Sequence, residues 1–76
     1  MEIAVFKSYK NGYYTFEFDN GEDMVFEEAH PKVLSQYNLK TDKELVGKTF
    51  QLTFSEVFED TDDDLVIYRI ESLKMR

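Results

Sequence analysis

Residues 9–26, YKNGYYTFEFDNGEDMVF, contain two Asn-Gly pairs, and these pairs indicate where the chain turns. Asn11-Gly12 and Asn20-Gly21 each favour a two-residue hairpin loop, because Asn and Gly tolerate the positive φ angles that such a loop requires. Apolar residues alternate with polar ones around both pairs, which is typical of β-strands. The first 28 residues are therefore predicted to form a three-stranded meander.

The strand between the two turns is predicted to have one buried and one solvated face. Tyr14, Phe16 and Phe18 alternate along it and form the apolar face. The opposite face carries mostly polar residues, namely Tyr13, Thr15, Glu17 and Asp19. This pattern is typical of an antiparallel strand with one wet side, so Tyr13 is expected to be exposed.

A change of period after the meander predicts a short helix over about 31–38. Val33, Leu34 and Tyr37 have helical spacing, and Pro31 suits the first position of a helix. His30 precedes this proline and is expected to contribute a polar atom near the helix cap. The only histidine is therefore interpreted as a helix cap and not as a catalytic or metal-binding residue.

The second half of the chain predicts two more strands. Thr41 and Glu44 have capping-box spacing and Gly47 stands at a stop position, which indicates one further helical turn. Alternation then returns over residues 48–58, where Phe50, Leu52, Phe54 and Phe58 share one face, and again over residues 64–73. The expected class is therefore mainly β, with one short helix after the third strand.

Residues 1–76 are predicted to form a single domain. Its elements are expected in the order three strands, one helix and two strands. The order resembles the OB-fold, a small five-stranded barrel that binds oligonucleotides or oligosaccharides. The resemblance implies a ligand across the second and third strands, flanked by the loops between strands one and two and between strands four and five. An SH3-like barrel and an open α+β sheet with the helix on one face are the alternatives.

Composition narrows the possible functions. The chain has no cysteine, which excludes a disulfide and a Cys/His zinc site, and its seven Phe and five Tyr can close a small core without such links. Sixteen acids and nine bases give a net charge of −7. Such a surface repels nucleic acid and anionic membranes and favours basic partners.

Residues 55–68, SEVFEDTDDDLVIY, contain six acids and no base between Glu56 and Asp64. Three of the aspartates and Glu71 match the spacing of an EF-hand calcium loop, but Leu65 stands where that loop needs glycine and the chain continues as a strand. No metal site is therefore predicted, and a weak hydrated divalent-ion site is kept as an alternative. The run is interpreted either as a solvated turn or as a docking surface for a basic partner.

No catalytic motif is found in the sequence. The serines lack the context of an activated nucleophile, and the three glycines are assigned to turns and a helix end. Arg69 is expected to form a structural ion pair, for example with Glu2 or Glu56. An enzyme is not expected, and no cofactor is predicted.

The resulting hypothesis is a non-enzymatic module that binds another protein through an acidic, tyrosine-bearing surface. The alternative is a single-stranded nucleic-acid binder that uses the face of the second and third strands. The N-terminus lacks signal-peptide features and no stretch reaches the ~18 apolar residues of a membrane span, so a cytoplasmic location is expected. The candidate partner-binding residues are Tyr13, Glu59, Asp60, Asp62, Asp63 and Asp64.

Overall fold

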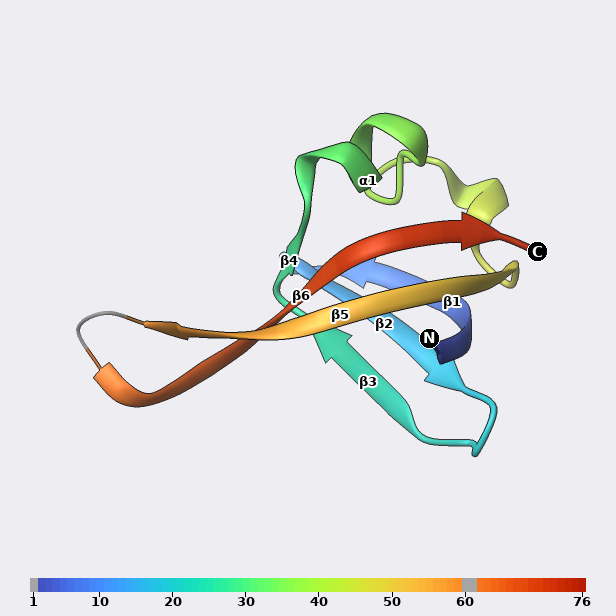
Figure 1. The fold of residues 1–76 in the computed structure, drawn as a ribbon. Coiled ribbons are helices and arrows are strands. Elements are labelled where there is room, and N and C mark those ends of the chain that lie inside the picture. Colours follow the sequence, from blue (N-terminus) through green and yellow to red (C-terminus); the bar gives the residue numbers. More distant parts are fainter. Residues whose placement is uncertain (1, 60–61) are drawn as a thin grey trace.

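The computed structural model describes residues 2–59 and 62–76, with the exception of the side chains of residues 59 and 62–65. Within these residues the chain is mainly β with one short α-helix, as the sequence predicts. The strands form one mixed sheet in the order β3-β2-β1-β5-β6-β4 (Figure 1). Their bounds are β1 Glu2–Lys10, β2 Tyr13–Phe18, β3 Asp23–Phe26, β4 Glu28–Ala29, β5 Thr49–Glu59 and β6 Asp62–Met75.

The first three strands form the predicted meander. β1 pairs antiparallel with β2, and β2 pairs antiparallel with β3. Asn11 and Gly12 have φ angles of 54° and 87°, as a two-residue hairpin loop of the primed type requires. Gly21 has a φ of 87°, and the Asn20 side chain accepts a hydrogen bond from the N–H of Glu22 at 2.9 Å. Local turn chemistry therefore sets the connections of the meander.

β3 and β4 lie at the two ends of the strand order, yet only Glu27 separates them along the chain. β4 pairs in parallel with β6, with Glu28 opposite Arg69. At the switch, the N–H of Glu27 donates to the carbonyl of Tyr68 at 3.1 Å, and the Glu27 carboxylate accepts from the N–H of Tyr68 at 2.7 Å. Glu27 thus carries the chain from its pairing with β2 to its pairing with β6.

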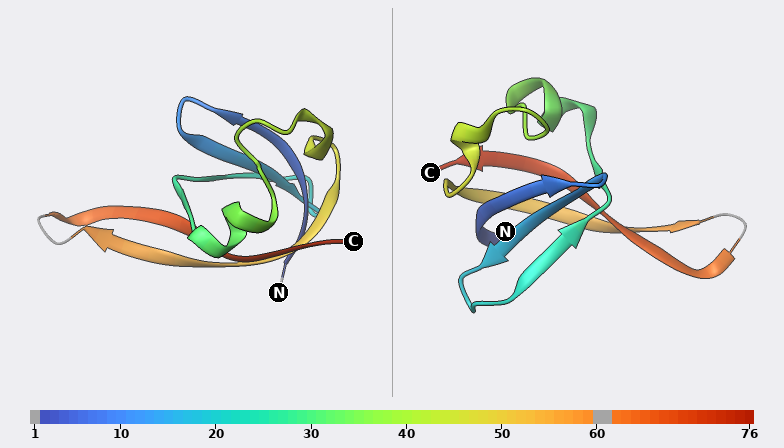
Figure 2. Two further views of the ribbon diagram at one scale, coloured as in Figure 1. Left: turned by 90° about the horizontal axis from the view of Figure 1, so that it is seen from above. Right: turned by 180° about the vertical axis from the view of Figure 1, so that it is seen from behind.

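β5 and β6 form a long antiparallel hairpin, paired from Phe50 opposite Met75 to Glu59 opposite Asp62. β1 pairs with β5 over the first four residues of β5 only, from Thr49 onward. Figure 2 shows from two further directions that the hairpin extends well beyond the rest of the sheet. The hairpin therefore has a proximal part inside the sheet and a distal part outside it.

The helix α1 (Pro31–Gln36) begins at the expected proline. His30 is its N-cap, and the Nδ1 atom of His30 accepts a hydrogen bond from the N–H of Lys32 at 3.0 Å, which confirms the predicted capping role. The helix is shorter than predicted because Tyr37 adopts an extended backbone, with φ −133° and ψ 121°. The hydroxyl of Tyr37 then accepts a hydrogen bond from the N–H of Met75 in β6.

A 3-10 turn, η1 (Lys43–Leu45), is the further helical turn that the sequence predicts. Its N-cap is Asp42, whose carboxylate accepts from the N–H of Glu44 at 3.0 Å. The predicted capping box from Thr41 is therefore wrong, because the adjacent aspartate reaches that N–H instead. Gly47 follows with a φ of 88°, which confirms its stop position.

Aromatic side chains form the centre of the core. The ring centroid of Phe16 in β2 lies 5.2 Å from that of Phe6, 5.8 Å from that of Phe26 and 6.2 Å from that of Phe50. Such pairs each contribute about 0.5–1.5 kcal/mol beyond the area that they bury. The largest fully buried side chains are Phe6, Phe16, Phe26, Phe50, Leu52, Ile70 and Val33.

The sheet is not closed into a barrel, so the open sheet is the one of the three expected architectures that describes it. It also has one strand more than predicted over the described residues. The additional strand is β4, which is too short to produce a recognisable alternation in the sequence. β4 forms only because β6 lies beside it, and the sequence alone does not reveal that neighbour.

Candidate functional site

We call residues 55–67, the distal part of the β5–β6 hairpin, the arm, and its described residues 55–59 and 62–67 project from the molecule (Figures 1 and 2). β1 pairs with β5 only as far as Leu52, and β4 pairs with β6 only at Arg69 and Ile70. In the described part of the arm, each strand pairs with the other strand of the hairpin alone. Over residues 55–59 and 62–67, both outer edges of the arm are therefore without a neighbouring strand.

The arm carries apolar side chains that do not join the core. Phe58 is 60% exposed, whereas Phe50 on the same strand is fully buried. Val57 is paired with Ile67 and Phe58 with Val66 across the hairpin, and none of these four residues belongs to the core cluster or packs against it. A two-stranded hairpin alone is only marginally stable in water. Exposed apolar surface on such a hairpin is typical of a site that contacts another molecule.

Most of the net negative charge also lies on the arm. Residues 55–67 contain six of the sixteen acids and none of the nine bases, so they account for −6 of the net charge of −7. Glu56 is exposed and is paired with Tyr68 across the hairpin. Of the predicted partner-binding residues, Asp60 and the side chains of Glu59, Asp62, Asp63 and Asp64 lie outside the described part of the structure.

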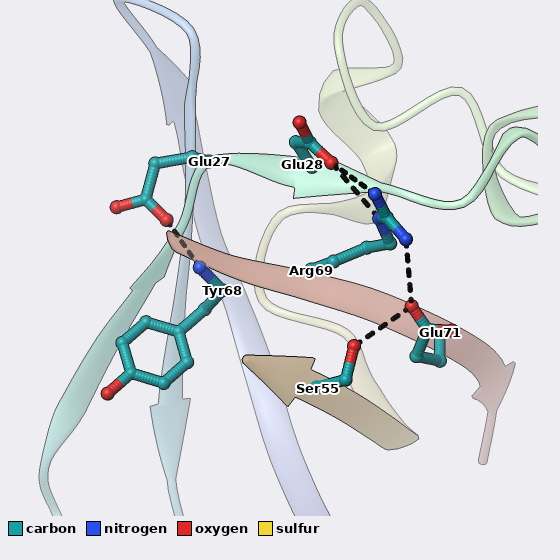
Figure 3. Close-up of polar contacts among 6 residues, drawn as sticks. All are labelled: Glu27, Glu28, Ser55, Tyr68, Arg69 and Glu71. Carbon is teal, nitrogen blue, oxygen red and sulfur yellow. Dashed lines mark hydrogen bonds and ion pairs between the residues drawn. The ribbon is translucent and has the colours of Figure 1, made fainter. Parts of the chain in front are cut away.

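A polar network links the base of the arm to β4 (Figure 3). Arg69 donates two hydrogen bonds to one carboxylate oxygen of Glu28, at 3.0 and 2.9 Å, and lies 3.8 Å from the carboxylate of Glu71. The hydroxyl of Ser55 donates to the same oxygen of Glu71 at 3.1 Å. Because these side chains are partly exposed, the network adds little to the free energy of folding, and its main effect is to hold the base of the arm in place against β4.

The partners of Arg69 differ from the predicted ones. Its carboxylates come from β4 and β6 and not from Glu2 or Glu56. The reason is the parallel pairing of β4 with β6, which places Glu28 directly opposite Arg69. A contact between segments so far apart along the chain leaves no local signal in the sequence.

Tyr13 lies at the start of β2 and is 47% exposed, which confirms that its side chain is wet. It is paired with Lys10 in β1. Val25 in β3 is 41% exposed and lies opposite Thr15, which makes it a diagonal neighbour of Tyr13 on the same face. Because β1 separates β2 from β5 in the sheet, Tyr13 and the arm do not share a strand pair.

A hollow of about 540 Å³, lined by polar and apolar groups alike, lies beside β4 and the start of α1. Its residue types occur in catalytic sites, but three of its side chains already have structural partners: Glu27 binds the backbone of Tyr68, Glu28 binds Arg69 and His30 caps α1. The hollow therefore shows no nucleophile paired with a base among these groups. Its lining includes Tyr14, Glu27, Glu28, His30, Lys40 and Arg69.

Burial raises the pKa of Tyr14, and the neighbouring Tyr9 raises it further. The two rings lie 4.8 Å apart between centroids, and Tyr14 is almost fully buried. Because loss of solvent disfavours the tyrosinate, this shift follows from packing. It gives no indication of a catalytic role.

Among the side chains that the structure describes, those of residues 2–58 and 66–76, no three His, Asp or Glu groups converge where they could hold a metal ion. β6 runs as a strand through Leu65 to Glu71, which confirms the predicted departure from an EF-hand loop. In the same part of the chain, neither helix has the length and apolar character that a membrane crossing requires.

The sequence predicts the charge of the arm but does not predict its projection or the exposure of Phe58. Alternation over residues 48–58 shows which residues share a face, but it does not show where the core ends. A signal was present in the strand lengths, because β5 and β6 have 11 and 14 residues whereas strands typically have about 5–6. Two such long alternating runs around an acidic turn indicate a hairpin that extends past its sheet.

Comparisons of the chain with protein-family models, curated proteins and solved structures find no match. The functional conclusion is therefore drawn from the geometry and charge of the molecule itself.

Proposed function

We propose that this chain is a non-enzymatic module that binds a basic protein through the arm. The observation that carries the proposal is the exposure of Phe58 on the projecting hairpin, within a stretch of sequence, residues 55–67, that contains six of the sixteen acids. An aromatic side chain that becomes buried on binding supplies affinity. Carboxylates around it accelerate association with a positive partner and disfavour acidic ones.

The charge of the remaining surface supports placing the contact on the arm. Outside residues 55–67, ten acids and nine bases nearly balance, so the rest of the chain has a net charge of only −1. A field this uneven directs the arm, and not the rest of the surface, toward a positive partner. The unpaired edges of the arm also allow a partner to add a strand by backbone hydrogen bonds.

The strand pairing supports the relation to the OB-fold that the element order suggests. β3 and β4, separated by Glu27, pair with β2 on one side and with β6 on the other, so the order of neighbouring strands is similar to that of the OB-fold although the sheet itself stays open. The arm then corresponds to the loop between the fourth and fifth strands, one of the two loops that flank the ligand in OB-folds. A contact through the arm is consistent with this position.

A second candidate function is single-stranded nucleic-acid binding on the outer face of β2 and β3. Tyr13 and Val25 are exposed there, and an exposed tyrosine can stack on a base. Glu17 and Asp23 are paired on the same face and would repel phosphates. Saturable, salt-sensitive binding of a labelled single-stranded oligonucleotide would favour this candidate, and no binding at low salt would favour the protein-binding function.

The protein-binding function is tested by capture from a nuclease-treated lysate of the native cell with two variants of equal charge. The arm variant carries Asn or Gln at Glu59, Asp60, Asp62, Asp63 and Asp64. The body variant carries Asn or Gln at Glu2, Asp19, Glu22, Asp23 and Glu44, whose side chains are all exposed. Both variants lose the same five negative charges, so only the position of the charge differs.

We expect the wild type and the body variant to capture the same protein and the arm variant to lose it. Equal loss in both variants would show that net charge alone governs capture, which contradicts a specific role of the arm. Equal retention in both would also contradict it. In that case the exposed face around Tyr13 becomes the surface to test.

A further inference from the structure

A shallow and mainly apolar hollow of about 420 Å³ lies between β1 and residues 39–46. Its lining includes the buried Phe6 and Leu39, and Val46 at the same site is 48% exposed. The N–H of Gly47 donates to the carbonyl of Phe6 at 2.7 Å, which ties the loop to the strand. The hollow is therefore built into the fold and leaves apolar surface in contact with solvent.

Lysine side chains surround this apolar surface. Lys7, Lys40 and Lys43 line the hollow together with one acid, Asp42, and because Lys7 lies 3.8 Å from the carboxylate of Glu17, the positive charge of the hollow comes from Lys40 and Lys43. The carboxylate of Asp42 already caps η1, and the ammonium of Lys40 lies 5.9 Å from the centroid of the Tyr9 ring. The hollow is thus a positive, apolar site on a chain whose net charge is −7.

The yellow-green turn of residues 43–45, which contributes Lys43 to the lining of the hollow, and the projecting β5–β6 hairpin lie on opposite sides of the molecule in Figures 1 and 2. Their chemistry is complementary, because the arm presents an exposed phenylalanine among acids and the hollow presents apolar surface among lysines. An arm directed away from its own hollow can reach only the hollow of another molecule.

We propose that the hollow binds the arm of a second copy of this chain. Phe58 of one copy contacts the apolar surface beside Val46 of the next, and the net negative charge of residues 55–67 is attracted to Lys40 and Lys43. This inference rests on the proposed binding role of the arm and assigns it one specific occupant. The contact is head-to-tail, so each bound pair keeps one free arm and one free hollow.

The contact is expected to be weak and sensitive to salt. A single hairpin in a shallow hollow buries little area compared with a stable interface. Two copies of charge −7 repel each other, but at about 0.1 M salt the screening length of ~10 Å preserves the close contacts between arm and lysines while it weakens the long-range repulsion. At about 0.5 M salt the close contacts weaken as well.

Sedimentation velocity over increasing concentration, to about 0.5 mM, tests this contact with three variants. Phe58→Ser removes the apolar anchor of the arm. Lys40→Glu with Lys43→Glu reverses the charge around the hollow. Lys32→Glu with Lys74→Glu changes the net charge equally at exposed positions outside the hollow and is the matched control.

We expect the wild type and the control to associate at about 0.1 M salt, and the arm and hollow variants to associate at least roughly tenfold more weakly. An equimolar mixture of the arm and hollow variants has one intact arm and one intact hollow, so it should form a 1:1 complex and nothing larger. A wild type that stays monomeric, a control that loses association equally, or a mixture that forms no complex would overturn the proposal. Capture of a lysate protein by a monomeric wild type would leave the proposed function intact and reject this contact alone.

Discussion

At the scale of single residues, phenylalanine has two roles in this molecule: it fills the core where a strand lies inside the sheet, and it is exposed where a strand extends into the arm. Phe16 is fully buried among other rings, whereas Phe58 is mostly exposed on the arm. Phe16→Ala should lower the free energy of unfolding by about 3–5 kcal/mol, and Phe58→Ser should change it by less than about 0.5 kcal/mol. Urea unfolding followed by circular dichroism measures both. A large destabilisation by Phe58→Ser would show that Phe58 belongs to the core.

Tyr14 gives stability a dependence on alkaline pH. Its pKa is raised in the folded state by burial first and by Tyr9 second, so the folded chain keeps the proton that the unfolded chain loses near pH 10.0. The stabilising contribution is therefore complete below pH 10.0 and is lost as the pH rises through the raised pKa. The wild type should lose stability relative to Tyr14→Phe over that range. Unfolding free energies that fall in parallel for both proteins would contradict this account.

His30 contributes to stability as a helix cap. Its Nδ1 atom accepts the hydrogen bond from the N–H of Lys32, which otherwise has no partner within the helix. His30→Ala should lower the free energy of unfolding by about 0.5–2 kcal/mol, whereas His30→Asn should retain most of it because asparagine is a strong N-cap. Thermal unfolding compares the three proteins. Equal losses in both variants would indicate that the imidazole matters for another reason.

At the scale of elements, the arm is expected to be separable from the rest of the fold. Val57 and Ile67 are paired across the hairpin, so Asn-Gly can replace residues 58–66 and close the strands with a two-residue loop. The shortened chain should keep its cooperative unfolding, because the buried core over the described residues contains no residue of the arm. It should also lose capture of the partner. A chain that no longer unfolds cooperatively would show that the arm stabilises the fold.

The elements that could be predicted from the sequence are those governed by local chemistry. The Asn-Gly turns, the start of α1 at Pro31 and the cap at His30 each depend on residues within a few positions of one another. The strand β4, the partners of Arg69 and the projection of the arm depend on which distant segments lie side by side. A single sequence does not contain that information, so it does not distinguish the open sheet from an OB-like or an SH3-like barrel.

At the scale of the whole molecule, charge and shape are both uneven. The extents of 37 × 27 × 22 Å describe an elongated molecule, and the arm holds −6 of the net −7. The acidic residues were predicted from the sequence as a candidate surface, but their side chains at 59 and 62–64 lie outside the described part of the structure. The described residues contribute instead the exposed Phe58, which the alternation pattern grouped with core residues. Both features together place the proposed contact on the arm.

The most direct measurement of this claim is photo-crosslinking in the native cell. A benzophenone-bearing amino acid is placed singly at position 58 on the arm, at position 13 on β2 and at position 36 at the end of α1, where the native side chains are all exposed. We predict an adduct from position 58 and none from position 36, with the mass of the adduct identifying either a basic protein or a second copy of this chain. An adduct from position 13 alone, or equal adducts from all three positions, would contradict the proposal that the arm is the binding element.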